Sequence, residues 1–474
     1  MIEVGIFPEK LKQAIIKPLF KNGKKNQIQN YRPVALLPIF SKLFEKVIYT
    51  RLVNYLEKNN LLNDAQCGFR KERSTTLAVF KILKEILDAI NTKMPATAIL
   101  LDMSKAFDCV IHTILLKQLA HIGVRGIPLK LMESYLTKRK QATEITFSDL
   151  KTKTLSCTRS PYTHIKVGVP QGSILGPLLF LVYINKFPQI IQDQTVLFAD
   201  DASIFFTSKS MNKMEYEQKI NNSLAKIIEW LKTLNLKINI NKTKYIQFHS
   251  YKAAHNNLKI SYNNNKVEEV NASKFLGLNI DKHLNWKLHI EYLNKKIRTY
   301  CYTLQIIKNT TNIKTAQSAY YAKVYSILNY GVIYWGNSVD SKTTFLLQKR
   351  CIRIIHNLDN ETSCRPTFKK YGYLTLTGIY ILQAAIFIKC NSNYFPDKNS
   401  LEYNRRLRNR DKLIIPQPHN EMYKRNMYFT SIKIYNHLPC KIRSLKLKSF
   451  KNVVKRLLIE HCFYDLKEYF EAKL

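Results

Sequence analysis

The chain has 474 residues, 46% of them hydrophobic, and it carries 75 Lys and Arg against 34 Asp and Glu. This length and apolar content allow about two or three domains with sizeable cores. The formal charge of +41 is far beyond what solubility requires and indicates a polyanionic partner. Because 28 Tyr and 23 Phe supply rings on which bases can stack, the composition favours nucleic acid as that partner over a merely basic surface.

The sequence also argues against a membrane or secreted protein. No apolar run reaches the roughly 18 residues of a membrane-spanning helix, and no secretory signal peptide is recognisable. The nine cysteines show no paired spacing, which indicates a reducing compartment without a disulfide framework. We therefore expect no membrane partner and a location in the cytoplasm, the nucleus or both.

The N-terminal part of the chain is expected to contain strand-like pieces followed by two helices. The basic cluster 21–25 indicates a solvated loop between the strand-like pieces. Apolar residues then recur at helical spacing over 43–52. A second helix is predicted over 77–87, capped by Thr75 or Thr76.

An acidic residue ends a short apolar run further along the chain. Residues 96–101 have the composition of a buried strand, and Asp102 follows directly. Asp108 then precedes a helical pattern that ends at Gly123, so its expected role is to cap that helix. Hard cations such as Mg²⁺ prefer carboxylate oxygens. Asp102 is therefore a candidate metal ligand, provided that a second acidic strand end lies nearby.

The middle of the chain holds a glycine-rich segment between two acidic sites. Residues 141–166 are polar and are expected to form strands joined by loops. In the segment 168–177, Gly172 permits a close approach of the backbone, and Gln171 offers both a donor and an acceptor. Such a segment suits contact with a ligand.

A carboxylate pair lies between two apolar runs at 196–206. The runs are rich in aromatic and β-branched residues, which predicts a β-hairpin with Asp200 and Asp201 at its tip. Two adjacent ionised carboxylates repel each other, and a divalent cation makes the pairing tolerable. Ordinary turn chemistry is the alternative. The apolar walls and the acidic strand end at Asp102 favour a two-metal clamp for phosphoryl transfer.

The remainder of the chain is predicted to be mainly helical. A helix is expected over 220–234, a strand over 245–248, and basic helices from Trp286 onward. From Leu401 to Leu474 the chain carries 17 Lys and Arg against 7 Asp and Glu, so this tail is expected to be helical and to face RNA or DNA.

Three motifs together resemble a known family. Asp102 to Phe107, Pro170-Gln171-Gly172 and Phe198-Ala199-Asp200-Asp201 occur in the order and at roughly the spacing found in reverse transcriptases. The sequences of the motifs are most similar to those of non-LTR (LINE-type) retrotransposons, particularly jockey-like elements. Two further segments, 30–33 and 68–70, resemble the fingers motifs of the same family.

The resemblance implies an α+β fold of the right-hand polymerase type. Fingers are expected over 1–95, an antiparallel-sheet palm with interleaved fingers segments over 96–280, a helical thumb over 281–345, and a basic helical C-terminal extension over 346–474. The reverse transcriptase domain itself is expected over roughly 25–280.

The resemblance also implies roles for individual residues. The catalytic residues and ligands of two Mg²⁺ ions, or of Mn²⁺ in their place, would be Asp102, Asp200 and Asp201. The nucleotide-binding residues would be Arg32, Arg70, Arg73, Phe107, Gln171 and Gly172, with Phe107 barring a 2′-hydroxyl. The general acid would be Lys242 or Lys244, between which the sequence does not choose, and the primer grip would be Phe275, Leu276 and Gly277.

The expected activity is RNA-directed DNA synthesis. A DNA primer would be extended with deoxynucleoside triphosphates on an RNA template, giving an RNA–DNA hybrid, by two-metal nucleotidyl transfer. Because fingers-like sequence begins almost at Met1, we expect a part of a mobile element that lacks its endonuclease domain. The alternative is a catalytically silent, nucleic-acid-binding remnant, against which the intact Asp102, Gln171, Asp200 and Asp201 argue. The template, the target site and the oligomeric state stay open.

Overall fold

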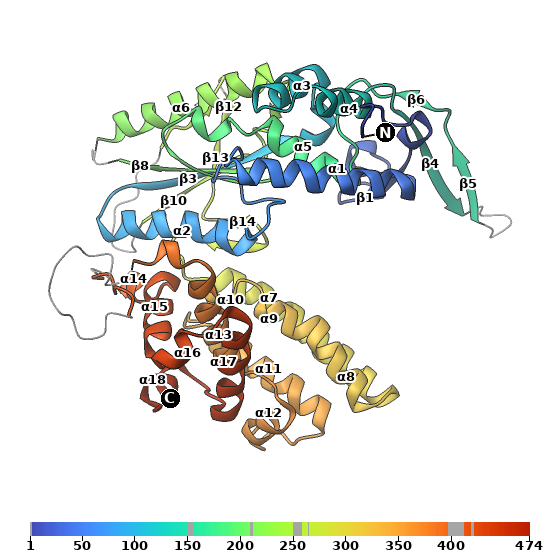
Figure 1. Cartoon of the computed structure of the whole chain (residues 1–474). Coiled ribbons are helices and arrows are strands. Elements are labelled where there is room, and N and C mark those ends of the chain that lie inside the picture. Colours follow the sequence, from blue (N-terminus) through green and yellow to red (C-terminus); the bar gives the residue numbers. More distant parts are fainter. Residues whose placement is uncertain are drawn as a thin grey trace. The chain divides into compact units, whose positions relative to one another are not determined.

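The computed structural model describes residues 2–148, 155–208, 212–249, 258–263, 265–396, 412–418 and 421–474 (Figure 1). The chain divides into two compact units. The first comprises Met1–Ile86, Pro95–Gln247 and Ala254–Val270, and the second comprises Leu87–Met94, Phe248–Ala253 and Asn271–Leu474.

The first unit mixes helices and strands. Its strands are β1 (Gln13–Phe20), β2 (Tyr31–Leu36), β3 (Ala96–Ser104), β4 (Lys140–Ser148), β5 (Leu155–Arg159), β6 (Thr163–His164), β7 (Gln194–Phe198), β8 (Asp201–Thr207), β9 (Lys237–Ile238), β10 (Lys244–Phe248), β11 (Ser261–Tyr262), β12 (Asn265–Lys266) and β13 (Glu268–Glu269). Its helices are α1 (Ile39–Lys58), α2 (Thr75–Asn91), α3 (His112–His121), α4 (Ile127–Leu136), α5 (Leu175–Tyr183) and α6 (Lys213–Thr233), with short 3₁₀ turns η1 (Glu9–Lys12), η2 (Ile28–Asn30), η3 (Ala106–Cys109) and η4 (Phe187–Gln189).

The central sheet of this unit has the strand order β13-β10-β3-β8-β7, and β9 also pairs with β3. The pairs β3–β8 and β7–β8 are antiparallel, whereas β10–β13 is parallel. A second sheet has the order β2-β1-β4-β5, with β6 on β4. The predicted hairpin at 196–206 is thus confirmed as β7 and β8, and the polar region 141–166 contains β4, β5 and β6, as expected.

One face of the central sheet is covered by helices. Ile99, Leu101 and Met103 of β3 share a core with Ala202, Ile204 and Phe206 of β8, and helices α3, α5 and α6 close that core (Figure 1). On α6 the buried positions recur at helical spacing, namely Tyr216, Ile220, Leu224, Ile227, Ile228 and Leu231. Because side chains alternate along a strand, the residues between the core positions, Asp102 and Asp201 among them, lie on the opposite face.

A buried carboxylate fixes the start of α5, just beyond the glycine-rich segment. Glu45 of α1 is fully buried and accepts hydrogen bonds from the Ile174 N–H at 2.6 Å, the Tyr135 hydroxyl at 3.2 Å and the Ser41 hydroxyl at 3.3 Å. A carboxylate at a helix N-terminus satisfies free N–H groups and complements the helix dipole. Glu45 therefore ties α1 to the segment that precedes α5.

Two helix caps differ from the sequence expectation. Ser74, rather than Thr75 or Thr76, caps α2, since its hydroxyl accepts the Leu77 N–H at 3.1 Å. Asp108 does not cap α3, which begins only at His112; Asp108 lies in the 3₁₀ turn η3 instead. The N-cap position of α3 is Ile111, and the Asp108 carboxylate accepts from Gln171 instead, so the N-cap prediction for Asp108 is wrong.

The second unit is mainly helical, as the sequence predicted. It begins with the hairpin β14 (Ala272–Phe275) and β15 (Leu278–Asp281). Its helices are α7 (Lys287–Thr310), α8 (Ile313–Ala319), the π-helical turn η5 (Tyr320–Tyr325), α9 (Ser326–Asn329), α10 (Val332–Trp335), α11 (Ser341–His356), α12 (Arg365–Tyr371), α13 (Leu376–Cys390), the 3₁₀ turn η6 (Ser392–Tyr394), α14 (Glu421–Arg425), α15 (Met427–His437), α16 (Cys440–Arg443), α17 (Leu447–His461) and α18 (Leu466–Glu471).

Helix α13 is the centre of this second unit. It is apolar on nearly all sides and packs against α15, α17 and α10, which is how a helix without a polar face is accommodated in a protein core. Among the described residues no single helix is long and apolar enough to cross a bilayer; α12 and α13 satisfy such a criterion only together, with a bend of 50° between them.

Candidate active site

Three carboxylates lie at the turn of the β7–β8 hairpin and on the adjacent strand β3 of the central sheet. Asp102 of β3 is the direct cross-strand partner of Asp201 of β8, and the turn between β7 and β8 consists of Ala199 and Asp200. The backbone pairing alone therefore brings together the two acidic sites that the sequence placed about 100 residues apart.

Burial and neighbouring negative charge raise the pKa values of two of these carboxylates. The pKa of Asp201 is raised to about 6, first by partial burial of the carboxylate and then by the neighbouring Asp200 and Asp102. The pKa of Asp200 is raised mainly by burial, and Asp102 adds to this. Carboxylates whose charge is disfavoured by burial and by neighbouring acids are what a divalent cation would stabilise.

The arrangement fits a metal held partly by substrate. Among the described residues no three acidic, histidine or cysteine side chains are placed to enclose an ion by themselves. Mg²⁺ usually takes only one or two carboxylates and completes its shell with water and substrate phosphates, so a closed protein cage is not required. Asp102, with a side chain 40% exposed, remains accessible to such a ligand.

The glycine-rich segment contacts the second sheet and the carboxylate of Asp108. The backbone carbonyl of Gln171 accepts the Ala35 N–H of β2 at 2.7 Å. A Cβ on Gly172 would lie only 2.6 Å from the Ala35 oxygen, so glycine is required for this close approach. The Gln171 side chain donates to the Asp108 carboxylate at 2.9 Å. Burial raises the pKa of Asp108, and this hydrogen bond opposes the rise.

Phe107 lies in η3, five residues after Asp102. Its ring packs on Phe180 of α5 with the centroids 4.6 Å apart, and the residue remains partly exposed. Its carbonyl accepts the Val169 N–H at 2.8 Å, which fixes η3 against the glycine-rich segment. Phe107 is thus held by the core on one side and accessible on the other. The sugar-selecting role stays a prediction.

Positive charge acts on the carboxylates from β2 and from the residue that follows β1. Both Arg32 and Lys21 lower the pKa values of Asp200 and Asp201, so they lie within electrostatic range of the acids. Arg32 is exposed on β2, the strand that Gln171 holds in place. Arg32 was expected from the sequence. Lys21 lies in the exposed loop that the sequence predicted, but no role was expected for it. No local sequence signal distinguishes Lys21 from its neighbours, because the strand pairing of β1 with β2 determines its position.

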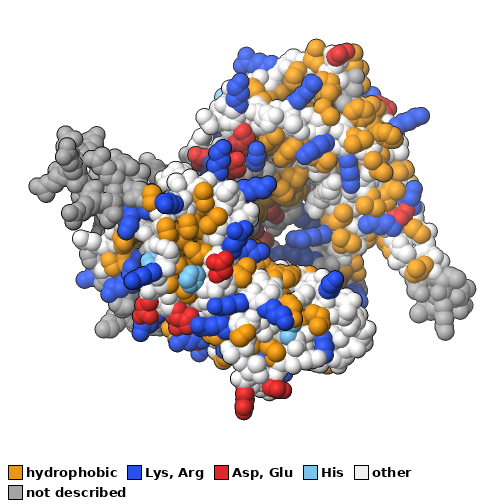
Figure 2. Space-filling model, turned by 60° about the horizontal axis from the view of Figure 1, so that its bottom comes forward, with side chains coloured by type: hydrophobic (Ala, Val, Ile, Leu, Met, Phe, Trp, Pro, Cys, Tyr) orange, Lys and Arg blue, Asp and Glu red, His pale blue; other side chains and the backbone are white. Residues whose placement is uncertain are grey.

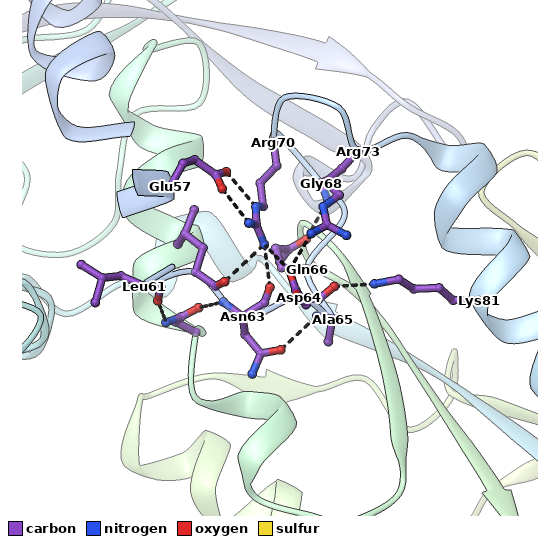
Figure 3. Close-up of polar contacts among 12 residues, drawn as sticks. Glu57, Leu61, Asn63, Asp64, Ala65, Gln66, Gly68, Arg70, Arg73 and Lys81 are labelled. Atoms are coloured by element: carbon purple, nitrogen blue, oxygen red, sulfur yellow. Dashed lines mark hydrogen bonds and ion pairs between the residues drawn. The ribbon is translucent and has the colours of Figure 1, made fainter. Parts of the chain in front are cut away.

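Arg70 and Arg73 are engaged within their own segment (Figure 3). Arg70 is 9% exposed; its guanidinium forms two hydrogen bonds with Glu57, at 2.9 and 2.7 Å, and a third with the Asn63 carbonyl at 2.8 Å. Arg73 pairs with Asp64. These contacts indicate that Arg70 stabilises the segment that leads from α1 to α2. Its expected contact with a triphosphate stays a prediction that this geometry does not favour.

The two lysines considered as general acids have different surroundings. Lys242 places its Nζ 3.8 Å from the Asp102 carboxylate and is 63% exposed. Lys244 instead pairs with Glu268 at 3.3 Å. The geometry therefore favours Lys242 as the lysine that can act beside the carboxylates.

The residues expected to hold the primer belong to the second unit. Leu276 and Gly277 form the turn between β14 and β15, and both have positive φ, of 44° and 86°. The Tyr330 hydroxyl donates to the Leu276 carbonyl, and a Cβ on Gly277 would approach the Tyr330 ring to 3.1 Å. Phe275 ends β14 and is buried. The three residues thus lie at the tip of a β-hairpin, and the primer-grip role stays a prediction.

An antiparallel sheet with facing acids on its central strands, and a third acid on the adjoining turn, is the palm of a right-hand polymerase. A comparison with protein-family models agrees with this class. The family described as reverse transcriptase (RNA-dependent DNA polymerase) matches residues 22–280. The chain belongs to the reverse transcriptase family.

Known relatives are polymerases of non-LTR retrotransposons. The chain is 28% identical over 375 residues to the probable RNA-directed DNA polymerase from transposon BS of Drosophila melanogaster, covering 75% of this chain and 39% of the relative. It is 29% identical over 308 residues to the RNA-directed DNA polymerase from the mobile element jockey of the same species, covering 63% and 32%. The chain thus spans about two fifths or less of the length of these relatives.

Among solved structures, telomerases are similar. Telomerase from Candida albicans in complex with a fragment of telomeric RNA has a TM-score of 0.41 at 14% identity, over 81% of this chain and 61% of that one. Apo telomerase from Candida tropicalis gives a TM-score of 0.40 at 12% identity, over 79% and 64%.

Proposed function

We propose that this chain is an RNA-directed DNA polymerase that extends a DNA primer on an RNA template with deoxynucleoside triphosphates. The observation that carries the proposal is the cross-strand pairing of Asp102 with Asp201 beside the turn that bears Asp200. Family membership supports the activity, and the charge of +41 supports polyanionic substrates.

Asp102, Asp200 and Asp201 would hold the divalent cations. When bound there, two such ions activate the primer 3′-hydroxyl and stabilise the triphosphate together with the leaving pyrophosphate. Asp200 is the more suitable direct ligand of the carboxylate pair, since the turn places it at the end of the hairpin. Mg²⁺ suits an all-oxygen site of this kind, and Mn²⁺ has similar preferences.

Arg32 and Lys21 would contact the triphosphate. Their charges already act on Asp200 and Asp201, and a guanidinium matches phosphate oxygens with two parallel hydrogen bonds. Gln171 and Gly172 would position the nucleotide through the β2 backbone that they fix. Phe107 would lie beside the sugar and exclude a 2′-hydroxyl by its bulk.

Lys242 would donate a proton to the leaving pyrophosphate. Its Nζ is adjacent to Asp102 and largely exposed, so it can reach a phosphate oxygen without breaking a buried contact. A general acid of this type contributes typically about 10²–10⁴-fold to a rate. Lys242→Met should therefore slow the chemical step, whereas Lys244→Met, which breaks only the pair with Glu268, should not.

The test is extension of a labelled DNA primer on an RNA template in the presence of Mg²⁺. Asp200→Asn removes the charge that the cation requires while keeping the shape of the side chain, and it should abolish extension. Glu229→Gln, on the exposed face of α6, is the matched control and should extend normally. Full extension by folded Asp200→Asn would overturn the metal assignment. Absence of extension by the parent protein, with retained binding of primer and template, would support the silent remnant instead.

A further inference from the structure

The turn that carries Asp200 contains a residue in an unfavourable conformation. Ala199 has φ of +59° and is only 6% exposed. A residue with a Cβ is disfavoured in this left-handed region and persists there only where its surroundings determine the backbone. The neighbours of Ala199 therefore decide where Asp200 points.

The main neighbour is the segment 65–68, which pairs with β7 at Leu197. The Leu197 N–H donates to the Ala65 carbonyl at 2.9 Å, and the Cys67 N–H donates to the Leu197 carbonyl at 2.8 Å. This short parallel pairing covers the edge of the hairpin up to Leu197, two residues before the turn.

Gln66 continues the contact into the turn itself. It is 3% exposed, and its Oε1 accepts the Ala199 N–H at 3.1 Å and the Gly68 N–H at 2.8 Å. Because both partners are donors, the amide must present its oxygen to them, which fixes its orientation. The Ala199 N–H lies outside the β7–β8 pairing, so this side chain supplies its acceptor.

Gly68 lies directly against the backbone of the same turn. A Cβ at this position would lie 2.4 Å from the Ala199 nitrogen and 3.0 Å from the Phe198 carbonyl carbon. Both are backbone atoms, which cannot move aside without moving the turn. The backbone of segment 65–68 is thus in direct contact with the backbone that carries Asp200.

The segment is in turn held by buried polar contacts (Figure 3). Arg70 joins Glu57 of α1 to the Asn63 carbonyl. The Asn185 side chain, just after α5, accepts the Asn63 N–H at 2.8 Å and donates to the Leu61 carbonyl at 2.7 Å. Segment 65–68 is therefore anchored to two helices of the first unit as well as to β7.

From these contacts we infer that Gln66 is a positioning residue for polymerisation, which holds the strained turn at Ala199 and thereby orients the Asp200 carboxylate. The inference rests on the proposed function, because it takes Asp200 as a metal ligand. It gives the segment around Gly68 a role distinct from contact with a triphosphate.

The test compares four variants of the full chain. Gln66→Met keeps the side-chain size but removes the acceptor, whereas Gln66→Glu keeps an oxygen for both N–H groups. Ile220→Val, on the buried face of α6, is the control for a general loss of stability. Asp200→Asn tests the metal assignment separately. The readouts are kcat and KM for the nucleotide, Mn²⁺ affinity of the free protein by electron paramagnetic resonance, and hydrogen exchange in peptides covering 196–203.

In Gln66→Met, kcat should fall at least ten-fold with KM changed less than three-fold. Mn²⁺ should bind more weakly, and exchange at the Ala199 amide should rise at least ten-fold. Gln66→Glu should restore amide protection and most of kcat, and Ile220→Val should match the parent in every readout.

Parental kcat and Mn²⁺ affinity in Gln66→Met would overturn the inference. An equal loss in Ile220→Val would also overturn it, because general destabilisation would then account for the effect. Neither result depends on Asp200→Asn, whose full activity would instead refute the assignment of Asp200 as a metal ligand; failure of the parent protein to extend a primer would refute the proposed function.

Discussion

Replacement of Glu45 should destabilise the first unit strongly, and the extent should depend on the substitute. Glu45→Leu leaves the part-buried Ile174 N–H and the buried Tyr135 hydroxyl without the acceptor that they have now. Each buried polar group left without a partner costs about 1–3 kcal/mol. The free energy of unfolding should therefore fall by roughly 2–6 kcal/mol.

Glu45→Gln should cost much less. Its carbonyl oxygen can still accept the Ile174 N–H, while its NH₂ group can donate to the hydroxyls of Ser41 and Tyr135, which are able to accept. Only the charge at the N-terminus of α5 is lost, at about 1 kcal/mol. For a domain of this size each kcal/mol lowers the melting temperature by roughly 2–4 °C. Glutamine should therefore lower it by a few degrees and leucine by roughly 4–24 °C.

Scanning calorimetry measures both variants, and hydrogen exchange of peptides covering 172–177 tests whether the loss is at α5. Glu229→Leu, in which an exposed glutamate is replaced, is the control and should melt within about a degree or two of the parent, since surface substitutions rarely exceed about 0.5 kcal/mol. Equal melting temperatures for Glu45→Leu and the parent would refute the capping role. Equal losses for glutamine and leucine would show that the charge, rather than the hydrogen bonds, supplies the stability.

Three further outcomes are expected. Burial and the nearby Lys274 lower the pKa of His289 to about 4 from 6.5. Between these pH values the unfolded chain binds a proton at this histidine that the folded chain excludes. The free energy of unfolding should therefore fall by up to about 3 kcal/mol as the pH is lowered from 6.5 to 4. His289→Gln should remove this slope in urea titrations, and identical slopes would contradict the reasoning. Phe107→Val should raise ribonucleotide incorporation roughly ten-fold or more, as loss of a steric contact usually does, and unchanged selectivity would identify Phe107 as core only. Affinity for primer and template should fall with salt, with a log–log slope of about −0.9 per phosphate neutralised on duplex DNA; a flat response would mean that the widely distributed Lys and Arg side chains in Figure 2 do not meet the strand.

Local sequence patterns were sufficient for the elements that carry the acids. The runs before Asp102 and around Asp200 are apolar, short and followed by polar residues, so strand and turn could be predicted without knowledge of their partners. The cross-strand register of Asp102 with Asp201 could not, because it depends on the core shared by β3, β8 and α6. The family resemblance, rather than periodicity, supplied that juxtaposition.

The contacts that the sequence did not predict link residues far apart in the chain. Glu45 lies 129 residues before Ile174, and Gln66 lies 133 residues before Ala199. The sequence neighbours of Glu45 and Gln66 do not distinguish these two residues from a glutamate or glutamine on the surface. The same limitation applied to Arg70, whose partner Glu57 belongs to the preceding helix. Only the folded structure shows that the charge of Arg70 is paired with Glu57.

The register between β3 and β8 has a consequence for how this protein tolerates insertions and deletions. Leu101 and Asp102 face opposite sides of the sheet, and pairing with Ala202 and Asp201 fixes which side each takes. Deleting one residue from 96–101 would shift the strand by one position, bringing the carboxylate into the apolar core and a neighbouring apolar residue to the opposite face. Most core substitutions leave the backbone pairing intact and so preserve the position of Asp102. A single in-frame codon loss in β3 should therefore inactivate the protein more completely than several conservative changes in the same strand.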